Sequence, residues 1–148
     1  MKNKFILLVS GAVVSLLLLI FSAQVFEMLY YEREFSNEMF NQGLYTIVAL
    51  LIVATAWVLG GIYYYVVNSV SFSRWYHWLI VLAVCAVLVP VVTYIYLDGQ
   101  FATDGLDFAS QQLTFSLYAM LVEIVVFIIA SFSMRWWSSN CRHTPIPE

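Results

Sequence analysis

Apolar residues along this chain fall into four long segments, which short polar connections separate. The segments cover residues 5–26, 44–67, 78–97 and 113–134. A helix of about 20 apolar residues crosses the ~30 Å hydrocarbon core of a bilayer, so each segment is long enough to span a membrane once and too short to span it twice. The pattern predicts an all-α membrane protein, a four-helix antiparallel transmembrane bundle that forms one domain over residues 1–148.

The composition agrees with this interpretation. The chain has 148 residues, of which 63% are hydrophobic and only 10% are charged, whereas an ordinary soluble domain has about 25% charged residues. The residues between the four segments are too few to form a separate folded domain. The composition therefore excludes a soluble protein and indicates that the lipid bilayer is its main partner.

The basic residues are distributed unevenly between the two sides that an alternating four-span topology creates. Arg33 alone falls on one side, and that side also carries most of the acidic residues. Because cytoplasmic loops are enriched in Lys and Arg, the opposite side is predicted to be cytoplasmic, with both termini there. This distribution predicts a multi-pass protein of the cell inner membrane. The basic residues on the predicted cytoplasmic side are Lys2, Lys4, Arg74, Arg135 and Arg142.

The first apolar segment could in principle be a cleaved secretory signal, because Lys2 and Lys4 precede it. Its apolar run is longer than the usual core of a signal peptide, and the sequence around Ala23 lacks the small residue that a cleavage site needs at Phe21. We therefore expect a retained first helix. Gly11, Ser15 and Ser22 form a narrow stripe of small residues on it, which is typical of close helix packing in membranes.

The connection after the first segment has its own pattern. Met28 and Met39 belong to an apolar face, while acidic residues occupy another face, so residues 27–42 are predicted to include a short amphipathic helix on the outer surface. This segment is a candidate platform for a partner protein, or alternatively a solvated connection. The candidate partner-binding residues, which we call the outer platform, are Glu27, Tyr31, Glu34, Phe35 and Glu38.

Aromatic residues gather at the predicted cytoplasmic boundary. Amphipathic rings prefer the membrane–water interface, so we interpret them as an aromatic belt, with a binding site as the alternative. The tail that follows Trp137 is short and contains two prolines, and we expect it to be mobile. The aromatic residues at this boundary are Tyr63, Tyr64, Tyr65, Phe72, Trp75, Tyr76 and Trp78.

Glu123 is the most unusual residue in the chain, because it lies at the centre of the fourth apolar segment. An acidic side chain at mid-membrane costs about 3 kcal/mol even on lenient insertion scales. On a helical wheel Glu123 lies on the side with small and polar residues, which is predicted to face protein or water. That side contains Gln112, Ser116, Ala119, Glu123, Ala130 and Ser133, and the opposite side contains Leu117, Leu121, Ile124, Ile128 and Phe132.

Counting residues from the segment ends places Ser15, Thr55 and Cys85 at about the depth of Glu123. No basic residue lies at that depth, and desolvation disfavours the charged form of an acid, so we expect Glu123 to be protonated and to donate a hydrogen bond to Ser15 or Thr55. Three roles remain open for it. It could be a structural hydrogen bond, a contact with a partner helix, or a site that binds and releases a proton or cation.

Other chemistries find little support in the sequence. His77 and His143 are too far from mid-membrane to bracket a haem, and Cys141 with His143 is too small a set for zinc. Cys85 and Cys141 lie at different depths, so we expect no disulfide between them. The chain contains no triad, phosphate-binding loop or basic cluster. We therefore expect no enzymatic activity, no cofactor, no metal and no nucleic acid.

The leading functional hypothesis is a small non-catalytic inner-membrane protein that acts by binding another membrane protein. Accessory subunits, immunity or exclusion proteins and assembly factors have this general outline, and a homo-oligomer is also compatible with it. The alternative hypothesis is a proton- or cation-handling channel or transporter subunit, in which Glu123 is the titrating group.

Overall fold

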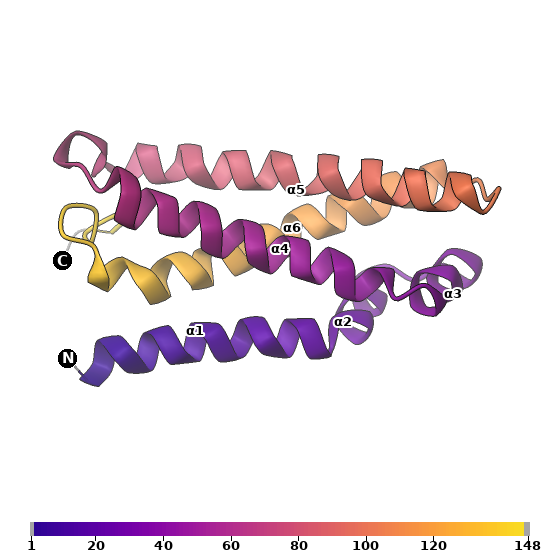
Figure 1. The fold of residues 1–148 in the computed structure, drawn as a ribbon, viewed down its shortest axis with the longest axis horizontal. Coiled ribbons are helices and arrows are strands. Elements are labelled where there is room, and N and C mark those ends of the chain that lie inside the picture. The colour runs from indigo at the N-terminus through magenta and orange to yellow at the C-terminus, as the bar shows by residue number, and fades with distance from the viewer. Residues whose placement is uncertain (1, 147–148) are drawn as a thin grey trace.

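The computed structural model describes residues 2–146, which form helices joined by short connections and no strands. Four long helices lie beside one another along the long axis of the molecule (Figure 1). They are α1 (Lys2–Ile20), α4 (Leu44–Gly61), α5 (Trp75–Thr103) and α6 (Ala109–Met134). The shorter helices are α2 (Ser22–Leu29), α3 (Arg33–Asn41), the π-helix η1 (Ile62–Val67), and the 3₁₀ helices η2 (Val70–Phe72) and η3 (Arg135–Trp137).

Four helical stretches of the described chain are long and apolar enough to cross a membrane, which confirms the predicted all-helical, four-span class. Their bounds differ in part from the prediction, because the third and fourth are longer at both ends. The stretches are Lys2–Ile20, Leu44–Val67, Trp75–Thr103 and Ala109–Trp137.

The first predicted segment, 5–26, does not form one straight helix, because α1 and α2 meet at a bend at Phe21. Helical hydrogen bonds continue through the bend, from the Phe21 amide to the Leu17 carbonyl oxygen (2.9 Å) and from the Val25 amide to the Phe21 carbonyl oxygen (3.0 Å). The bend turns α2 so that Phe26 is completely buried between the rings of Tyr45 and Phe115. Burial of this ring accounts for the change of direction.

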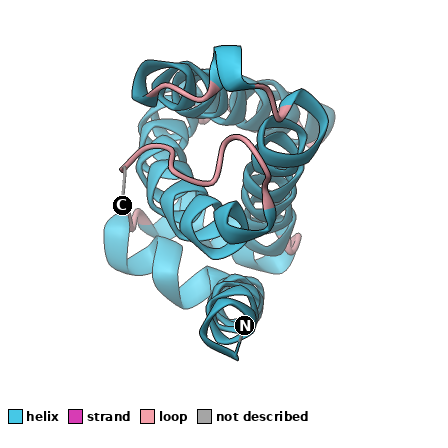
Figure 2. Ribbon diagram, turned by 90° about the vertical axis from the view of Figure 1, so that its left-hand side faces the viewer, coloured by secondary structure: helices cyan, strands magenta, loops and turns pink. Residues whose placement is uncertain are grey.

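Helices α4, α5 and α6 form the centre of the molecule, and α1 lies to one side of them (Figure 2). Helix α1 approaches α6 closely at Gly11, where a Cβ atom would lie only 2.7 Å from the Cβ atom of Ser133. Gly11, Ser15 and Ser22 are all buried. The small-residue stripe therefore marks a close helix contact, as the sequence predicted.

The two faces of α6 follow the predicted wheel. The six residues of the small, polar side are all buried inside the bundle, while Leu117, Leu121 and Ile128 on the opposite side are exposed and Ile124 and Phe132 are partly exposed. Exposed aliphatic side chains on a membrane-spanning helix are suited to contact with lipid, so this periodicity correctly separated the protein-facing side of α6 from its outer side.

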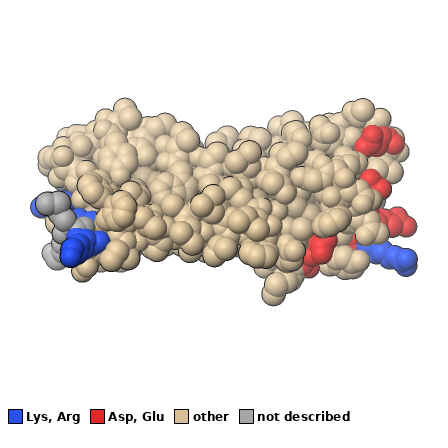
Figure 3. Space-filling view, turned by 60° about the horizontal axis from the view of Figure 1, so that its bottom comes forward, with Lys and Arg blue, Asp and Glu red and all other residues tan. Residues whose placement is uncertain are grey.

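The two ends of the molecule differ in charge (Figure 3). We call them the α3 end, which holds α3 and the turn between α5 and α6, and the terminal end, which holds both chain termini (Figure 1). Acidic residues gather at the α3 end together with one basic residue, and the other basic residues visible on this face lie at the terminal end (Figure 3). Charges therefore segregate along the long axis as the sequence pattern requires.

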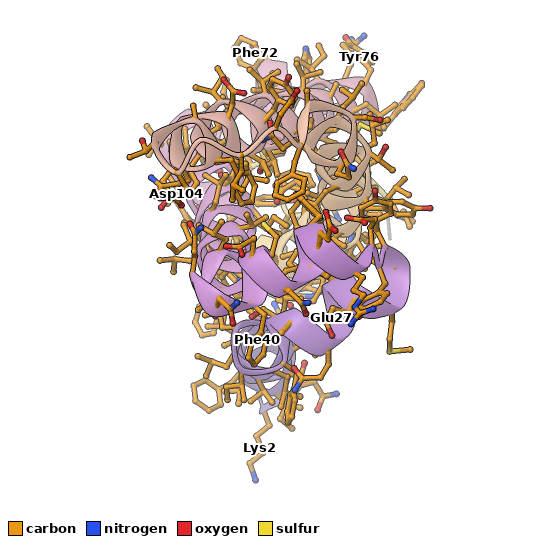
Figure 4. The ribbon with its side chains drawn as sticks, turned by 90° about the vertical axis from the view of Figure 1, so that its right-hand side faces the viewer. Lys2, Glu27, Phe40, Phe72, Tyr76 and Asp104 are labelled. Carbon is orange, nitrogen blue, oxygen red and sulfur yellow. The ribbon has the colours of Figure 1, made fainter. Side chains whose placement is uncertain are left out.

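Aromatic rings close the α3 end from inside. Phe35 of α3 is completely buried, and its ring centroid lies 5.7 Å from those of Phe101 and Phe108 and 5.8 Å from that of Phe115. Met39 on the same helix is also completely buried. These side chains anchor α3 across the end of the bundle, and Figure 4 looks onto this end.

The C-terminal segment 138–146 folds back onto the terminal end, so the expectation of a mobile tail was wrong for these residues. The Thr144 hydroxyl donates to the Ser73 carbonyl oxygen (2.9 Å), and the Asn68 side-chain oxygen accepts from the Ser138 hydroxyl (2.8 Å) and from the Asn140 amide (2.9 Å). These partners lie about 70 residues away in the chain, which a local reading of composition cannot detect. Residues 147–148 lie outside the described part.

The aromatic residues at this end do not form a simple belt. Tyr63, Tyr64 and Trp78 are buried, and their polar atoms bond to other parts of the protein. Phe72 and Trp75 are exposed, as a belt requires, and so are Tyr65 and Tyr76. The belt interpretation is therefore wrong for Tyr63, Tyr64 and Trp78. Buried Tyr and Trp side chains need hydrogen-bond partners, and these three find them inside the protein.

Candidate functional site

Glu123 lies midway along α6 and has no exposed surface. Neither of its carboxyl oxygens makes a hydrogen bond to any described residue. The Cys85 thiol on α5 is the neighbouring titratable group that interacts with this carboxyl group, although the two do not form a geometrically acceptable hydrogen bond. A completely buried acid without a protein partner is rare in native proteins and calls for an explanation.

The expected hydrogen bond between Glu123 and Ser15 is not formed. The Ser15 hydroxyl donates to the Gly11 carbonyl oxygen (2.9 Å) and accepts from the Trp57 indole N–H (2.9 Å). The reason is the position of α1, whose Gly11 packs against Ser133. Ser133 is about 15 Å along α6 from Glu123 at 1.5 Å per residue, whereas Ser15 is about 6 Å along α1 from Gly11.

Thr55 lies on the buried side of α4, but it makes no hydrogen bond to Glu123 either. Of the three residues expected at the level of Glu123, Cys85 lies beside it, and neither Ser15 nor Thr55 forms a hydrogen bond with it. Counting residues from segment ends assumed that all four helices are centred at one depth. The close contact of Gly11 with Ser133 shifts α1 away from that arrangement.

The inward side of α5 faces the inward side of α6 over the whole length of the two helices. Trp78 contacts Phe127 (ring centroids 5.6 Å apart), Cys85 lies beside Glu123, and Phe101 contacts Phe108 (5.2 Å). The buried residues of α5 recur at every fourth position between these contacts. They are Cys85, Val89, Thr93, Leu97 and Phe101.

Polar side chains between Glu123 and the α3 end lack hydrogen-bond partners. The Thr93 hydroxyl oxygen, the Gln112 side-chain oxygen and the Tyr45 hydroxyl oxygen are all buried and make no hydrogen bond to a described residue. Ser116 lies on the same side of α6 and donates to the Gln112 carbonyl oxygen (2.8 Å). A column of incompletely paired polar groups therefore extends from Glu123 toward the α3 end.

The polar side chains nearest to Glu123 on the terminal side are paired with one another, and the buried His77 Nδ1 and Arg135 Nε atoms, which lack a partner among the described residues, lie farther out. The Trp78 indole N–H donates to the Ser131 hydroxyl oxygen (2.6 Å), and the Tyr64 hydroxyl donates to the Thr144 carbonyl oxygen (3.0 Å). The hydroxyl oxygens of Tyr64 and Ser131 lie 2.7 Å apart. Because the single proton of Tyr64 is already used, Ser131 is the donor in that contact. The four groups form one continuous hydrogen-bonded chain.

The outer platform is only partly a surface. Phe35 is completely buried, whereas Tyr31 is 60% exposed and Glu34 is also exposed. Glu27 and Glu38 are half-buried, and Figure 4 shows Glu27 and Asp104 on different sides of this end. The structure therefore divides the predicted platform into one buried anchor and four residues that reach the surface.

Sequence reasoning missed the polar role of Tyr64, Trp78 and Ser131. Their side chains looked like interface aromatics and a small residue, and only their long-range contacts reveal the chain of hydrogen bonds.

The described residues include no group of three or more His, Cys, Asp or Glu side chains that could hold a metal ion.

A surface groove of about 470 Å³ lies between α1–α2 and α6 and is lined only by apolar residues such as Leu18, Phe21 and Val126. It offers no polar group that could take part in chemistry.

Comparison with protein-family models, with curated proteins and with solved structures finds no match to this chain.

Proposed function

We propose that this protein is a non-catalytic channel or transporter subunit that binds and releases a proton or cation at Glu123. The single observation that supports this proposal is that Glu123 is completely buried and both of its carboxyl oxygens lack a protein partner. Ionisable residues inside membranes are costly, and those that are retained typically mark ion or proton pathways. The protein thus bears the desolvation cost of an acid without a compensating hydrogen bond.

The other two roles of Glu123 have less support. A structural role would need a donor or acceptor within hydrogen-bond distance, and among the described residues Glu123 has none. A direct contact with a partner helix would need exposed surface, and Glu123 has none of that either. Binding of a small ion or proton needs neither condition, because the ligand itself enters the site and supplies the missing interaction.

The topology that we propose with this function is an antiparallel four-span bundle in the cell inner membrane, with both termini in the cytoplasm. The segregation of charge between the two ends supports this orientation (Figure 3). By their positions in the chain, Lys2, Lys4, Arg135 and Arg142 belong to the terminal end. The α3 end would then face the outside.

A second candidate function is binding of another integral membrane protein, or of a second copy, through the outer platform. The supporting observation is that Phe35 and Met39 anchor α3 firmly while Glu34 and Tyr31 stay exposed. An anchored helix that presents the acidic Glu34, with the aromatic Tyr31 just before it in the chain, is a suitable surface for a basic partner.

The proposed function can be tested in liposomes that contain the full chain and an internal pH-sensitive dye. A potassium gradient with valinomycin imposes a membrane potential, and the rate of internal pH change measures proton flux. Glu123→Gln preserves size and hydrogen-bonding capacity but cannot titrate, so its flux should fall to that of empty liposomes. Glu34→Gln removes an exposed acid far from the bundle centre and should keep the wild-type flux.

Sodium and potassium gradients with ion-sensitive dyes test the cation alternative in the same liposomes. Circular dichroism and size-exclusion chromatography show whether each variant is folded. Flux in Glu123→Gln equal to that of the wild type, or no proton or cation flux above empty liposomes in the wild type, would refute the proposal.

A further inference from the structure

The interior of the bundle differs on the two sides of Glu123. Toward the α3 end, Thr93, Gln112 and Tyr45 each have a buried oxygen without a protein partner. Toward the terminal end, Trp78, Ser131 and Tyr64 bond to one another, and the unpaired His77 Nδ1 and Arg135 Nε atoms lie beyond this chain of hydrogen bonds. Buried polar groups that lack protein partners are usually satisfied by water, whereas a saturated network has no free donor or acceptor to offer.

We propose that Glu123 exchanges its proton or cation with the α3 end, through a hydrated path past Thr93, Ser116 and Gln112, while the terminal end is closed. This inference rests on the proposed function of Glu123 and specifies the side from which its ligand enters. The path is formed by the inward sides of α5 and α6.

The spacing of the polar groups suits such a path. Ser116 and Gln112 lie about 10 Å and about 16 Å from Glu123 along α6 at 1.5 Å per residue. Thr93 is about 12 Å along α5 from Cys85, the residue beside Glu123, so it lies near the level of Ser116. Ala119 occupies the intervening turn of α6 with a small side chain. About three water molecules at ordinary hydrogen-bond distances would connect Ser116 to Glu123.

The terminal side of Glu123 is closed by packing and by hydrogen bonds. Phe127, one turn from Glu123, is completely buried and packs against the ring of Trp78 (5.6 Å). Beyond these rings, Ser131 and Tyr64 connect to the carbonyl oxygen of Thr144 in the folded-back tail. A proton or cation that came from this side would have to displace both the rings and the tail.

The α3 end has a different kind of closure. Phe35, Phe101 and Phe108 pack there through their rings, and a side-chain hydrogen bond connects Gln42 to Asp104 (2.8 Å). The α3 helix is connected through an extended residue at Glu32 and through Gly43 at a positive φ of 66°. Rings that pack by dispersion can move apart without leaving buried polar groups unpaired, so this closure can open without the penalty that breaking the hydrogen-bonded one carries.

The native thiol of Cys85 is a reporter of access to Glu123, because the two side chains are neighbours and Cys85 is completely buried. A Cys141→Ser background leaves Cys85 as the only thiol of the full chain. The probe is 2-aminoethyl methanethiosulfonate, added to one side of membrane vesicles with free cysteine as scavenger on the other side. Two control variants identify which vesicle face carries each end. Asn37→Cys and Ser139→Cys each place one exposed cysteine in a chain that also carries Cys85→Ser and Cys141→Ser.

We expect Cys85 to react at least ten times faster when the reagent is on the α3 side. Thr93→Val and Gln112→Leu should each slow this reaction several-fold, because they remove polar groups of the path. Thr103→Val on the same helix as Thr93, and Gln111→Leu next to Gln112, change the same chemistry outside the buried column and should leave the rate unchanged. Circular dichroism of each variant confirms that it is folded.

Faster labelling from the terminal side, no labelling from either side, or equal rates in the wild type and both path variants would overturn the inference. Labelling does not require transport, so its result is separate from the flux experiment. Flux that depends on Glu123 together with access from the terminal side would refute only the path. Access from the α3 side without flux would refute only the proposed function.

Discussion

The hydroxyl group of Tyr64 donates a hydrogen bond to the backbone carbonyl oxygen of Thr144, 80 residues later in the chain. The same hydroxyl oxygen accepts from Ser131 on α6. One buried side chain on the π-helix η1 therefore connects α6 to the folded-back tail. This contact joins the closed end of the bundle to the C-terminal segment, and its removal should affect both.

Tyr64→Phe should release the tail. The change leaves the buried Ser131 hydroxyl and Thr144 carbonyl oxygen without their partner, which costs about 1–3 kcal/mol of stability. Cys141 reports the release, because it is a buried residue of the tail and burial raises the pKa of its thiol. The thiol is therefore protonated and slow to react in the folded chain at neutral pH.

In a Cys85→Ser background, maleimide should label Cys141 several-fold faster in the Tyr64→Phe variant than in the parent chain. Tyr94→Phe, which changes a half-buried ring on α5, is the matched control and should leave the rate unchanged. Equal labelling of Cys141 in both variants would show that Tyr64 does not hold the tail.

Gly11→Ala should separate α1 from α6. The new Cβ atom would lie 2.7 Å from the Cβ atom of Ser133, which is too close for two carbon atoms, and overpacking of this kind costs about 1–3 kcal/mol. The free energy of unfolding in a titration with sodium dodecyl sulfate measures the loss. Gly61→Ala meets no atom closer than 4.0 Å and should be neutral or slightly stabilising. Recovery of stability in Gly11→Ala with Ser133→Gly would confirm the contact, and a Gly11→Ala variant as stable as the wild type would exclude it.

Phe35→Ala should destabilise the α3 end. Phe35 is completely buried among Phe101, Phe108 and Phe115, and removal of a buried aromatic ring typically costs about 3–5 kcal/mol. The melting temperature in mild detergent, followed by circular dichroism, should fall clearly. Phe40→Ala on the same helix removes a ring that is 63% exposed and should change the melting temperature little. Similar melting temperatures for both variants would contradict the anchoring role of Phe35.

Glu34→Gln combined with Glu38→Gln tests the second candidate function. If a basic partner binds the outer platform, this double change should reduce the partner that co-purifies in mild detergent by about tenfold, because it removes two charges without altering side-chain size, and added salt should have a similar effect. Quantitative mass spectrometry of the purified samples provides the measurement. Asp98→Asn with Asp107→Asn removes two exposed acids from the same end and serves as the charge-matched control. An unchanged set of co-purified proteins in the Glu34, Glu38 variant would argue against a role for the platform.

The sequence by itself determined the features that depend on each helix alone. Four apolar segments of sufficient length became helices long and apolar enough to span a membrane, because a helix satisfies all of its backbone hydrogen bonds within one segment. The periodicity of α6 placed Glu123 on the buried side, since only one side of that helix lacks large aliphatic residues. The uneven distribution of basic and acidic residues likewise predicted the charge difference between the two ends (Figure 3).

The tertiary structure decided the features that depend on how helices meet. The contact of Gly11 with Ser133 sets the position of α1, and it removed Ser15 from the neighbourhood of Glu123. The docking of Thr144 on Tyr64 and Ser73 turned an apparently loose tail into a closure of the terminal end. Complementary shapes and single hydrogen bonds between distant residues determine such contacts, and neither leaves a periodic signal in the sequence. For the same reason only the folded chain could reveal that Trp78, Ser131 and Tyr64 are paired on one side of Glu123, while Thr93 and Gln112 on the other side have unpaired oxygens.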